Sequence, residues 1–187
     1  MTQNKDNQQE IPTEGELAWL AGVIECDGSI TLSCTVRKEG SRPKVGTEIK
    51  LYNTDAGIIT QASYIIQKIG LKSYMTERTQ VPMEMRNGKT YGDRTKVMLS
   101  ISVKNIGDAY LLGKLLYPWM FGEKKHRLLL VIQYLARRID KFEENDGNKK
   151  IPLDKGDCEL IADFYQKFVK RKGHNRHLVE AILNDFT

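Results

Sequence analysis

Two kinds of hydrophobic spacing follow one another near the start of the chain. From position 17 to 24, apolar residues recur at intervals of three and four, which is the stripe that one face of a helix buries. From position 29 the interval becomes two, as in a strand with one buried face. The apolar members are Leu17, Leu20, Ala21 and Ile24 in the first stretch, and Ile30, Leu32, Cys34 and Val36 in the second. The sequence therefore predicts a helix that runs directly into a strand.

Local signals predict both ends of this helix. Thr13 and Glu16 stand three residues apart, like the two halves of a capping box, and predict its start. Gly28 suits the left-handed turn with which many helices end.

The same reasoning predicts the rest of the chain. Strands are expected at about 44–53, 72–80 and 94–103, and a helix that starts near Asp55 and ends at Gly70. Four further helices are expected at about 106–116, 124–143, 157–171 and 177–185. The predicted fold class is α+β, an antiparallel sheet with helices on one face. Its other face, polar to basic on the first strand, is left exposed, and such a face is often only a solvated surface.

Composition and length narrow the class of protein. The 187 residues fit one domain, expected at 13–187, behind a polar and flexible tail at 1–12. The net charge is +5, which suits a polyanionic partner. Three cysteines without a CxxC pair argue against a disulfide framework and a zinc site. There is no signal peptide and no apolar run long enough for a membrane span, so we expect an intracellular protein with no membrane role.

The end of the first helix carries a motif. "LAGVIECDG", residues 20–28, resembles the defining motif of the LAGLIDADG homing endonucleases and shares six of its nine letters. The motif also ends a capped helix and runs into an alternating strand, in the family's αββαββα order. The resemblance covers about residues 13–186. It implies the family's saddle-shaped antiparallel sheet, with one motif per chain.

The resemblance assigns roles to the two motif acids. Both lie at the carboxyl end of a helix, where the dipole makes a carboxylate unfavourable, and in this family divalent cations offset that charge. It implies that Asp27 is a metal ligand, assisted by the backbone carbonyl of Cys26, and that Glu25 helps to cap the partner helix. Oxygen ligands favour Mg²⁺ or Mn²⁺. The alternative is that both acids belong to a solvated turn.

Two further catalytic residues are expected by resemblance. Lys124 is the candidate basic residue, since "YPWMFGEKKHRLLLVI" resembles a family stretch in which lysines open a long helix, with a register shifted by about one residue. Asn53 lies where the family often has a side chain that orders water. Lys124 could instead belong to a solvated first turn, and Asn53 could serve only to cap the next helix.

A single motif implies a homodimer. The family cuts both DNA strands with two acid clusters, and this chain supplies one, so we expect a C2 dimer and a roughly palindromic target. The small residues Ala18, Ala21 and Gly22, with Glu25, are expected at the interface between two motif helices. The alternative is that the small residues pack within their own chain.

The exposed face of the sheet is expected to bind double-stranded DNA in the major groove. Arg37 and Lys50 are the expected guanine readers. The full set of expected base and backbone contacts is Thr31, Ser33, Thr35, Arg37, Lys44, Glu48, Lys50, Arg78, Arg94, Lys96, Lys170, Arg171 and Lys172. The last three are expected to clamp phosphates, or alternatively to be an ordinary charged helix end.

The sequence thus favours a site-specific, metal-dependent DNA endonuclease. Two alternatives on the same fold stay open: a maturase that binds intron RNA, and a DNA-binding regulator without nuclease activity. The presence of both Glu25 and Asp27 favours cleavage, because a protein that only binds needs neither.

Overall fold

The computed structural model describes residues 11–35, 44–79, 83–84, 90–91, 97–145, 147 and 151–169. The helices are α1 (Glu14–Asp27), α2 (Ala56–Lys68), α3 (Ile106–Leu116), the short 3-10 helix η1 (Tyr117–Trp119), α4 (Gly122–Glu144) and α5 (Lys155–Phe168). The strands are β1 (Gly28–Thr35), β2 (Lys44–Asn53), β3 (Tyr74–Thr79), β4 (Met83–Glu84), β5 (Thr90–Tyr91) and β6 (Val97–Val103). The predicted α+β class is confirmed.

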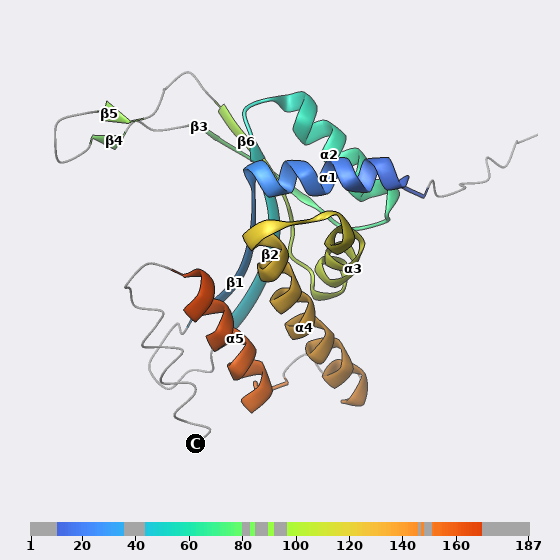
Figure 1. The fold of residues 1–187 in the computed structure, drawn as a ribbon, viewed down its shortest axis with the longest axis vertical. Coiled ribbons are helices and arrows are strands. Elements are labelled where there is room, and N and C mark those ends of the chain that lie inside the picture. The colour runs from blue at the N-terminus through green and yellow to red at the C-terminus, as the bar shows by residue number, and fades with distance from the viewer. Residues whose placement is uncertain are drawn as a thin grey trace, which may run out of the picture.

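Four strands form one antiparallel sheet in the order β1-β2-β6-β3. The two short strands β4 and β5, which the sequence did not predict, pair with each other away from this sheet (Figure 1). Consecutive elements therefore build most of the sheet, while β6 inserts between β2 and β3.

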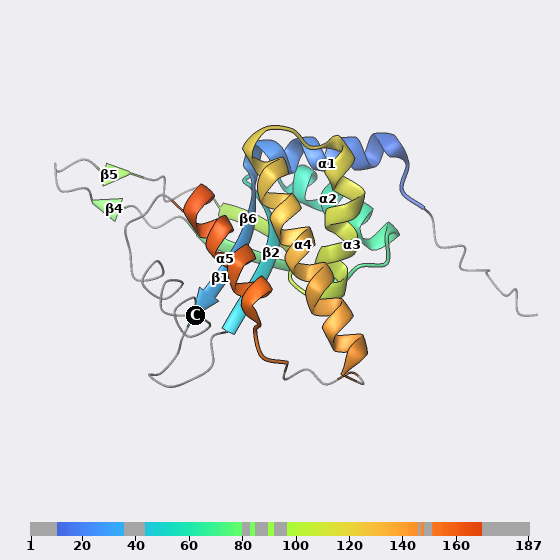
Figure 2. The same cartoon turned by 60° about the horizontal axis from the view of Figure 1, so that its bottom comes forward.

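The helices cover one face of the sheet. Figure 2 shows α3, α4 and α5 side by side over it, with α1 across their upper ends. Alternate residues of the strands point into the space beneath, for example Ile30 and Leu32 on β1 and Ile49 and Leu51 on β2, all buried. The opposite face of the sheet carries no helix in the described part of the chain.

The start of α1 is built as the sequence predicts. Thr13 and Glu16 form a capping box: the Glu16 amide donates to Thr13 Oγ1 (3.2 Å) and the Thr13 amide to Glu16 Oε2 (2.8 Å). Lys68 Nζ, from α2, donates to Glu16 Oε1 (2.9 Å). The hydrogen bond from the Thr13 backbone, followed by that from Lys68, lowers the pKa of Glu16. This carboxylate therefore fixes both the start of α1 and its position against α2.

The expectation of a left-handed turn at Gly28 is wrong. Gly28 has extended backbone angles (φ −94°, ψ 173°) and is the first residue of β1. A Cβ atom here would lie 2.6 Å from the carbonyl oxygen of Ile24 and 2.8 Å from its Cα atom. Glycine is needed because the strand leaves the helix at very close range.

Other predicted boundaries differ in two ways. Helix α5 begins at Lys155, earlier than expected, because Asp154 and Asp157 form a second capping box. The segments 94–96, 170–171 and 177–185, and most of the tail at 1–12, lie outside the described residues. Among the helices that the structure describes, none is long and apolar enough to cross a membrane.

Candidate active site and nucleic-acid interface

Asp27, the last residue of α1, is held in place by Asn53 at the end of β2. Asn53 Nδ2 donates to Asp27 Oδ2 (2.9 Å), and Asn53 Oδ1 accepts from the Asp55 amide (2.8 Å). Asp55 in turn caps α2 by accepting from the Gly57 amide (2.7 Å). Asn53 therefore stabilises the turn before α2, as the capping alternative expects, and also orients the carboxylate of Asp27. Its expected role in ordering water stays a prediction.

Asp27 lies at a cleft of about 370 Å³ that is also lined by Asn53, Tyr52, Thr54 and Met98. Tyr52 is paired with Ser100 in the sheet register, and Met98 lies two residues before Ser100, so both side chains belong to the uncovered face of the sheet. The cleft thus connects the motif carboxylate with that face. Sequence reasoning missed Tyr52, Thr54 and Met98. Tyr52 could have been found, because it lies two residues after Lys50 on the same strand and therefore shares its face.

Lys124, in the first turn of α4, binds the carboxyl end of α1. Its Nζ atom donates to the backbone carbonyls of Ile24 (3.0 Å), Glu25 (2.5 Å) and Cys26 (3.3 Å). These carbonyls form the negative end of the helix dipole, which a cation stabilises. The side chain is therefore held at the end of the helix that Asp27 closes, with its three donors directed at backbone oxygens. The catalytic role expected of Lys124 stays a prediction.

Glu25 lies between α1 and the start of α4. Gly122 has a positive φ of 63°, and a Cβ atom there would lie 3.4 Å from Glu25 Oε1. Glu25 Oε2 is buried and has no hydrogen-bond partner among the described residues. A buried carboxylate oxygen without a donor is costly, so the placement of Glu25 does not favour the fold of the described chain.

The described residues around Asp27 suit a magnesium-like cation only if it finds further ligands beyond them. In the part of the chain that the structure describes, no three His, Cys, Asp or Glu residues are grouped closely enough to hold a metal. Mg²⁺, however, is often bound by one or two carboxylates, with water and substrate phosphates as its other ligands. Asp27 is exposed, and one of its oxygens is available beside the bond to Asn53.

The small residues of α1 divide between core and surface. Ala21 is fully buried in its own chain, so it offers no surface to a partner, and for this residue the expectation of an interface position is wrong. Ala18 and Gly22 are partly exposed, and a Cβ atom on Gly22 would have no neighbour within 4 Å. Three large apolar side chains on or near α1 and η1 are also exposed: Trp19, Trp119 and Phe121.

The uncovered face of the sheet holds every described member of the expected DNA-binding set. Registers pair Thr31 with Glu48, Thr35 with Lys44, and Arg78 with Met98, and paired residues share a face. Ser33 lies opposite Gly46, and Lys50 opposite Ser29 and Ser102. The remaining expected contacts lie outside the described residues: Arg37, Arg94, Lys96, Lys170, Arg171 and Lys172.

Lys50, expected to read guanine, is engaged within the face. Its Nζ lies 4.7 Å from the centre of the Tyr52 ring and 4.0 Å from Glu48 Oε1, and its side chain is only 13% exposed. Lys104, which the sequence analysis missed, pairs with the same Glu48 oxygen at 3.2 Å. Lys50 therefore has to leave the Tyr52 ring before it can contact a base.

Comparison with known proteins identifies the class. Residues 14–106 match the family model of the LAGLIDADG-like domain. The chain therefore carries a LAGLIDADG-like domain, and the family resemblance drawn from its motif is confirmed.

Solved structures have the same fold at low sequence identity. The homing endonuclease I-CvuI in complex with its target is 17% identical, with a TM-score of 0.58, over 92% of this chain and 94% of that one. The archaeal intron-encoded homing endonuclease I-Vdi141I, complexed with DNA, is 14% identical, with a TM-score of 0.59, over 92% and 96%. For I-SmaMI bound to cleaved DNA the values are 13% and 0.57, over 95% of this chain but 50% of that one. No curated protein sequence matches.

Proposed function

We propose that this protein is a site-specific DNA endonuclease that works as a homodimer with a divalent cation. The observation that carries the proposal is the position of Asp27. It ends the motif helix, is oriented by Asn53, and lines a cleft with side chains of the uncovered sheet face. A nuclease needs this combination of a metal-binding carboxylate and an adjoining surface for the duplex.

The structural relatives support DNA as the partner. I-CvuI was solved with its target, I-Vdi141I with DNA and I-SmaMI with cleaved DNA. In this chain the corresponding surface is the uncovered sheet face, where Lys44, Arg78 and the hydroxyls of β1 are exposed or partly exposed. The net charge of +5 favours association with a polyanion.

Asp27 and the carbonyl of Cys26 would hold Mg²⁺ or Mn²⁺. Such a cation supplies an activated water and neutralises charge on the phosphate during hydrolysis. Asn53 fixes the orientation of the Asp27 carboxylate. Lys124 holds the carboxyl end of α1 through three carbonyls and so positions both ligands.

Several features support a dimer through α1. This chain matches 94% of the I-CvuI chain but only 50% of the I-SmaMI chain. Two copies of this chain would therefore be needed to match the whole of I-SmaMI. Ala18 and Gly22 form an open surface on α1. Glu25, at the carboxyl end of the same helix, is also partly exposed. Two copies related by a two-fold axis would read a roughly palindromic target.

Gly22→Leu should convert the dimer to monomers in light scattering. The leucine has open space within its own chain, so the fold should persist, and the larger side chain acts only by separating two helices. Gly107→Leu is the matched control, because a Cβ at Gly107 also has no neighbour within 4 Å. A dimer that survives Gly22→Leu would contradict an interface at this helix.

Cleavage of a randomised duplex library with Mg²⁺ tests the function itself. The wild type should cut at long, near-palindromic sites. Asp27→Asn should cut on the order of 10³-fold more slowly and still bind, since a metal contact contributes several kcal/mol to the transition state. Asp163→Asn, at an exposed ion pair on α5, should cut normally.

Retained cutting by Asp27→Asn would place the metal elsewhere, and binding without cutting by the wild type would favour a regulator. If the wild type neither cuts nor binds DNA, an RNA maturase becomes the better account.

A further inference from the structure

The end of α5 is in contact with a side chain from the start of α4. The guanidinium carbon of Arg127 lies 5.1 Å from the centre of the ring of Phe168, which is the last residue of α5. Arg127 Nη2 lies 3.5 Å from the Phe168 carbonyl oxygen, which is long for a hydrogen bond. The contact therefore rests on the attraction of the cation to the ring and to the negative end of the α5 dipole.

Neighbouring residues hold both partners of this contact. Arg127 Nε donates to Glu123 Oε1 (3.0 Å), one turn earlier on α4, and only 26% of the Arg127 side chain is exposed. Phe168 packs edge-on against the buried Phe164, with the ring centres 5.4 Å apart. Because the guanidinium and the ring are each held by their own helix, their contact costs little further side-chain entropy.

The same part of α4 also holds the end of α1. Lys124 and Arg127 are three residues apart on α4 and are therefore neighbours on its surface. Lys124 binds the three carbonyls that precede Asp27, and Arg127 contacts Phe168. Figure 2 shows the start of α4 and the end of α5 at the upper end of the helical layer, where α1 crosses. The first two turns of α4 thus connect the carboxyl ends of α1 and α5.

Residues proposed for DNA cleavage and phosphate binding stand at these two helix ends. Asp27 is the last residue of α1. The expected phosphate contacts Lys170, Arg171 and Lys172 begin two residues after Phe168. Where these cations can reach the DNA backbone, relative to Asp27, therefore depends on where α5 ends relative to α1.

We propose that Arg127 is a positioning residue for phosphate binding, which holds the end of α5 so that residues 170–172 reach the DNA backbone in register with Asp27. This inference rests on the proposed binding and cleavage of DNA. A cation that leaves a fixed helix end loses less conformational freedom on binding than one that leaves a loosened end. Arg127 thus contributes to affinity and not to the chemical step.

Hydrogen exchange of the Val169 amide tests the positioning without DNA. This amide donates to the Tyr165 carbonyl (3.1 Å) and closes the last turn of α5. It should exchange roughly 3- to 10-fold faster in Arg127→Leu, because the last turn opens more readily. Lys167→Leu is the matched control. It removes a cation from the same turn, but one that pairs with Asp163 at the surface, so exchange should change by less than about 2-fold.

A double-mutant cycle then connects Arg127 with the basic segment. The ligand is a duplex that the wild type retains from a randomised library. Arg127→Leu should weaken its binding roughly 3- to 10-fold. In a variant with Gln at all three positions 170–172, Arg127→Leu should weaken binding by less than about 2-fold, because the cations that it positions are gone. Lys167→Leu should have the same small effect in both backgrounds.

Phe168→Leu separates positioning from charge. It removes the ring that Arg127 contacts and leaves every charge in place, so it should weaken binding to a similar degree, and only when residues 170–172 are unchanged. The cleavage rate with saturating protein should be that of the wild type in Arg127→Leu and in Phe168→Leu, since Asp27 and Lys124 keep their contacts. If Arg127 instead bound DNA itself, Phe168→Leu would bind like the wild type.

The possible failures are distinguishable. If no duplex is retained, the proposed function is wrong and this inference with it. Three results would overturn only the inference about Arg127: unchanged exchange at Val169 in Arg127→Leu, equal effects of Arg127→Leu with and without the basic segment, or normal binding by Phe168→Leu.

Discussion

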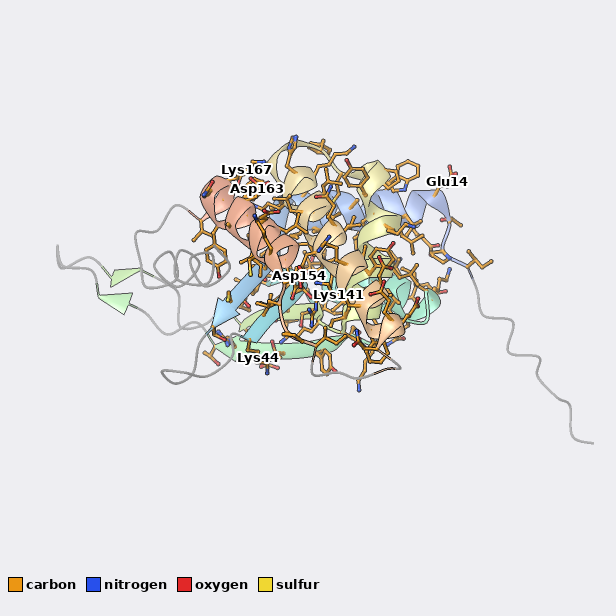
Figure 3. All side chains as sticks on the ribbon, turned by 90° about the horizontal axis from the view of Figure 1, so that it is seen from below. Glu14, Lys44, Lys141, Asp154, Asp163 and Lys167 are labelled. Atoms are coloured by element: carbon orange, nitrogen blue, oxygen red, sulfur yellow. The ribbon has the colours of Figure 1, made fainter. Side chains whose placement is uncertain are left out.

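Carboxylates lie in very different surroundings at the carboxyl end of α1 and at the junction of α4 and α5. Asp157, on α5, is fully buried and accepts from Lys141 Nζ (2.6 Å), Arg138 Nη1 (3.1 Å) and Arg137 Nε (3.4 Å). Its neighbour Asp154 pairs with Lys141 (2.7 Å), and Figure 3 shows these two side chains together. Both acids of this junction are saturated, in the sense that each pairs with two or more Lys or Arg side chains.

Asp154 illustrates the effect of that saturation. Burial alone would raise the pKa of its carboxyl group, but hydrogen bonds from Lys141, the Asp157 backbone and Arg137 outweigh burial, so the pKa lies well below its usual range. Its ionised form is thus stabilised by the fold itself. The structure holds α5 against α4 through this network.

The two acids at the carboxyl end of α1 are not saturated. Asp27 receives one amide hydrogen bond, from Asn53, and Glu25 has a buried oxygen without a donor among the described residues. The nearby cation, Lys124, donates to backbone carbonyls instead. This protein therefore satisfies the acids that hold its fold, leaves one oxygen of Glu25 unsatisfied, and leaves the carboxylate of Asp27 exposed.

Removing the saturated acid should have the largest effect on stability. Asp157→Asn leaves Arg138 and Lys141 without their buried anion, and we expect a loss of about 3 to 5 kcal/mol in the free energy of unfolding by urea. Asp163→Asn, which breaks an exposed pair with Lys167 on the same helix, should change it by less than about 0.5 kcal/mol. Equal effects of the two changes would remove the distinction between saturated and open acids.

Lys124→Met should have an intermediate effect. It removes a charged donor from three carbonyls at the end of α1, and we expect a loss of about 1 to 2 kcal/mol in the free energy of unfolding. Lys125→Met is the control, because the Lys125 ammonium group lies over the Tyr117 ring (4.9 Å) and should matter less. If Lys124→Met unfolds like the wild type while cleavage is lost, Lys124 acts directly in catalysis and not by positioning α1.

The sequence predicted what local spacing determines. The capping box at Thr13, the passage from helix to strand at Gly28 and the outward set on β1 all follow from neighbours within a few residues. The contact of Lys124 with the end of α1 joins residues about a hundred positions apart. The sequence signal for Lys124 was a resemblance to a family stretch whose register is shifted by about one residue. Ala21 was misplaced for a related reason: α1 is in contact with elements on more than one side, so its periodicity could not separate core from interface.

Urea unfolding of Asp27→Asn is the most direct way to learn what this acid does. We propose that Asp27 serves the reaction and not the fold. The variant should then be as stable as the wild type or more stable by about 0.3 to 1 kcal/mol, since it removes a negative charge from the negative end of a helix dipole. A loss of more than about 1 kcal/mol, in the direction expected for Asp157→Asn, would show that Asp27 is a structural acid and would contradict the account.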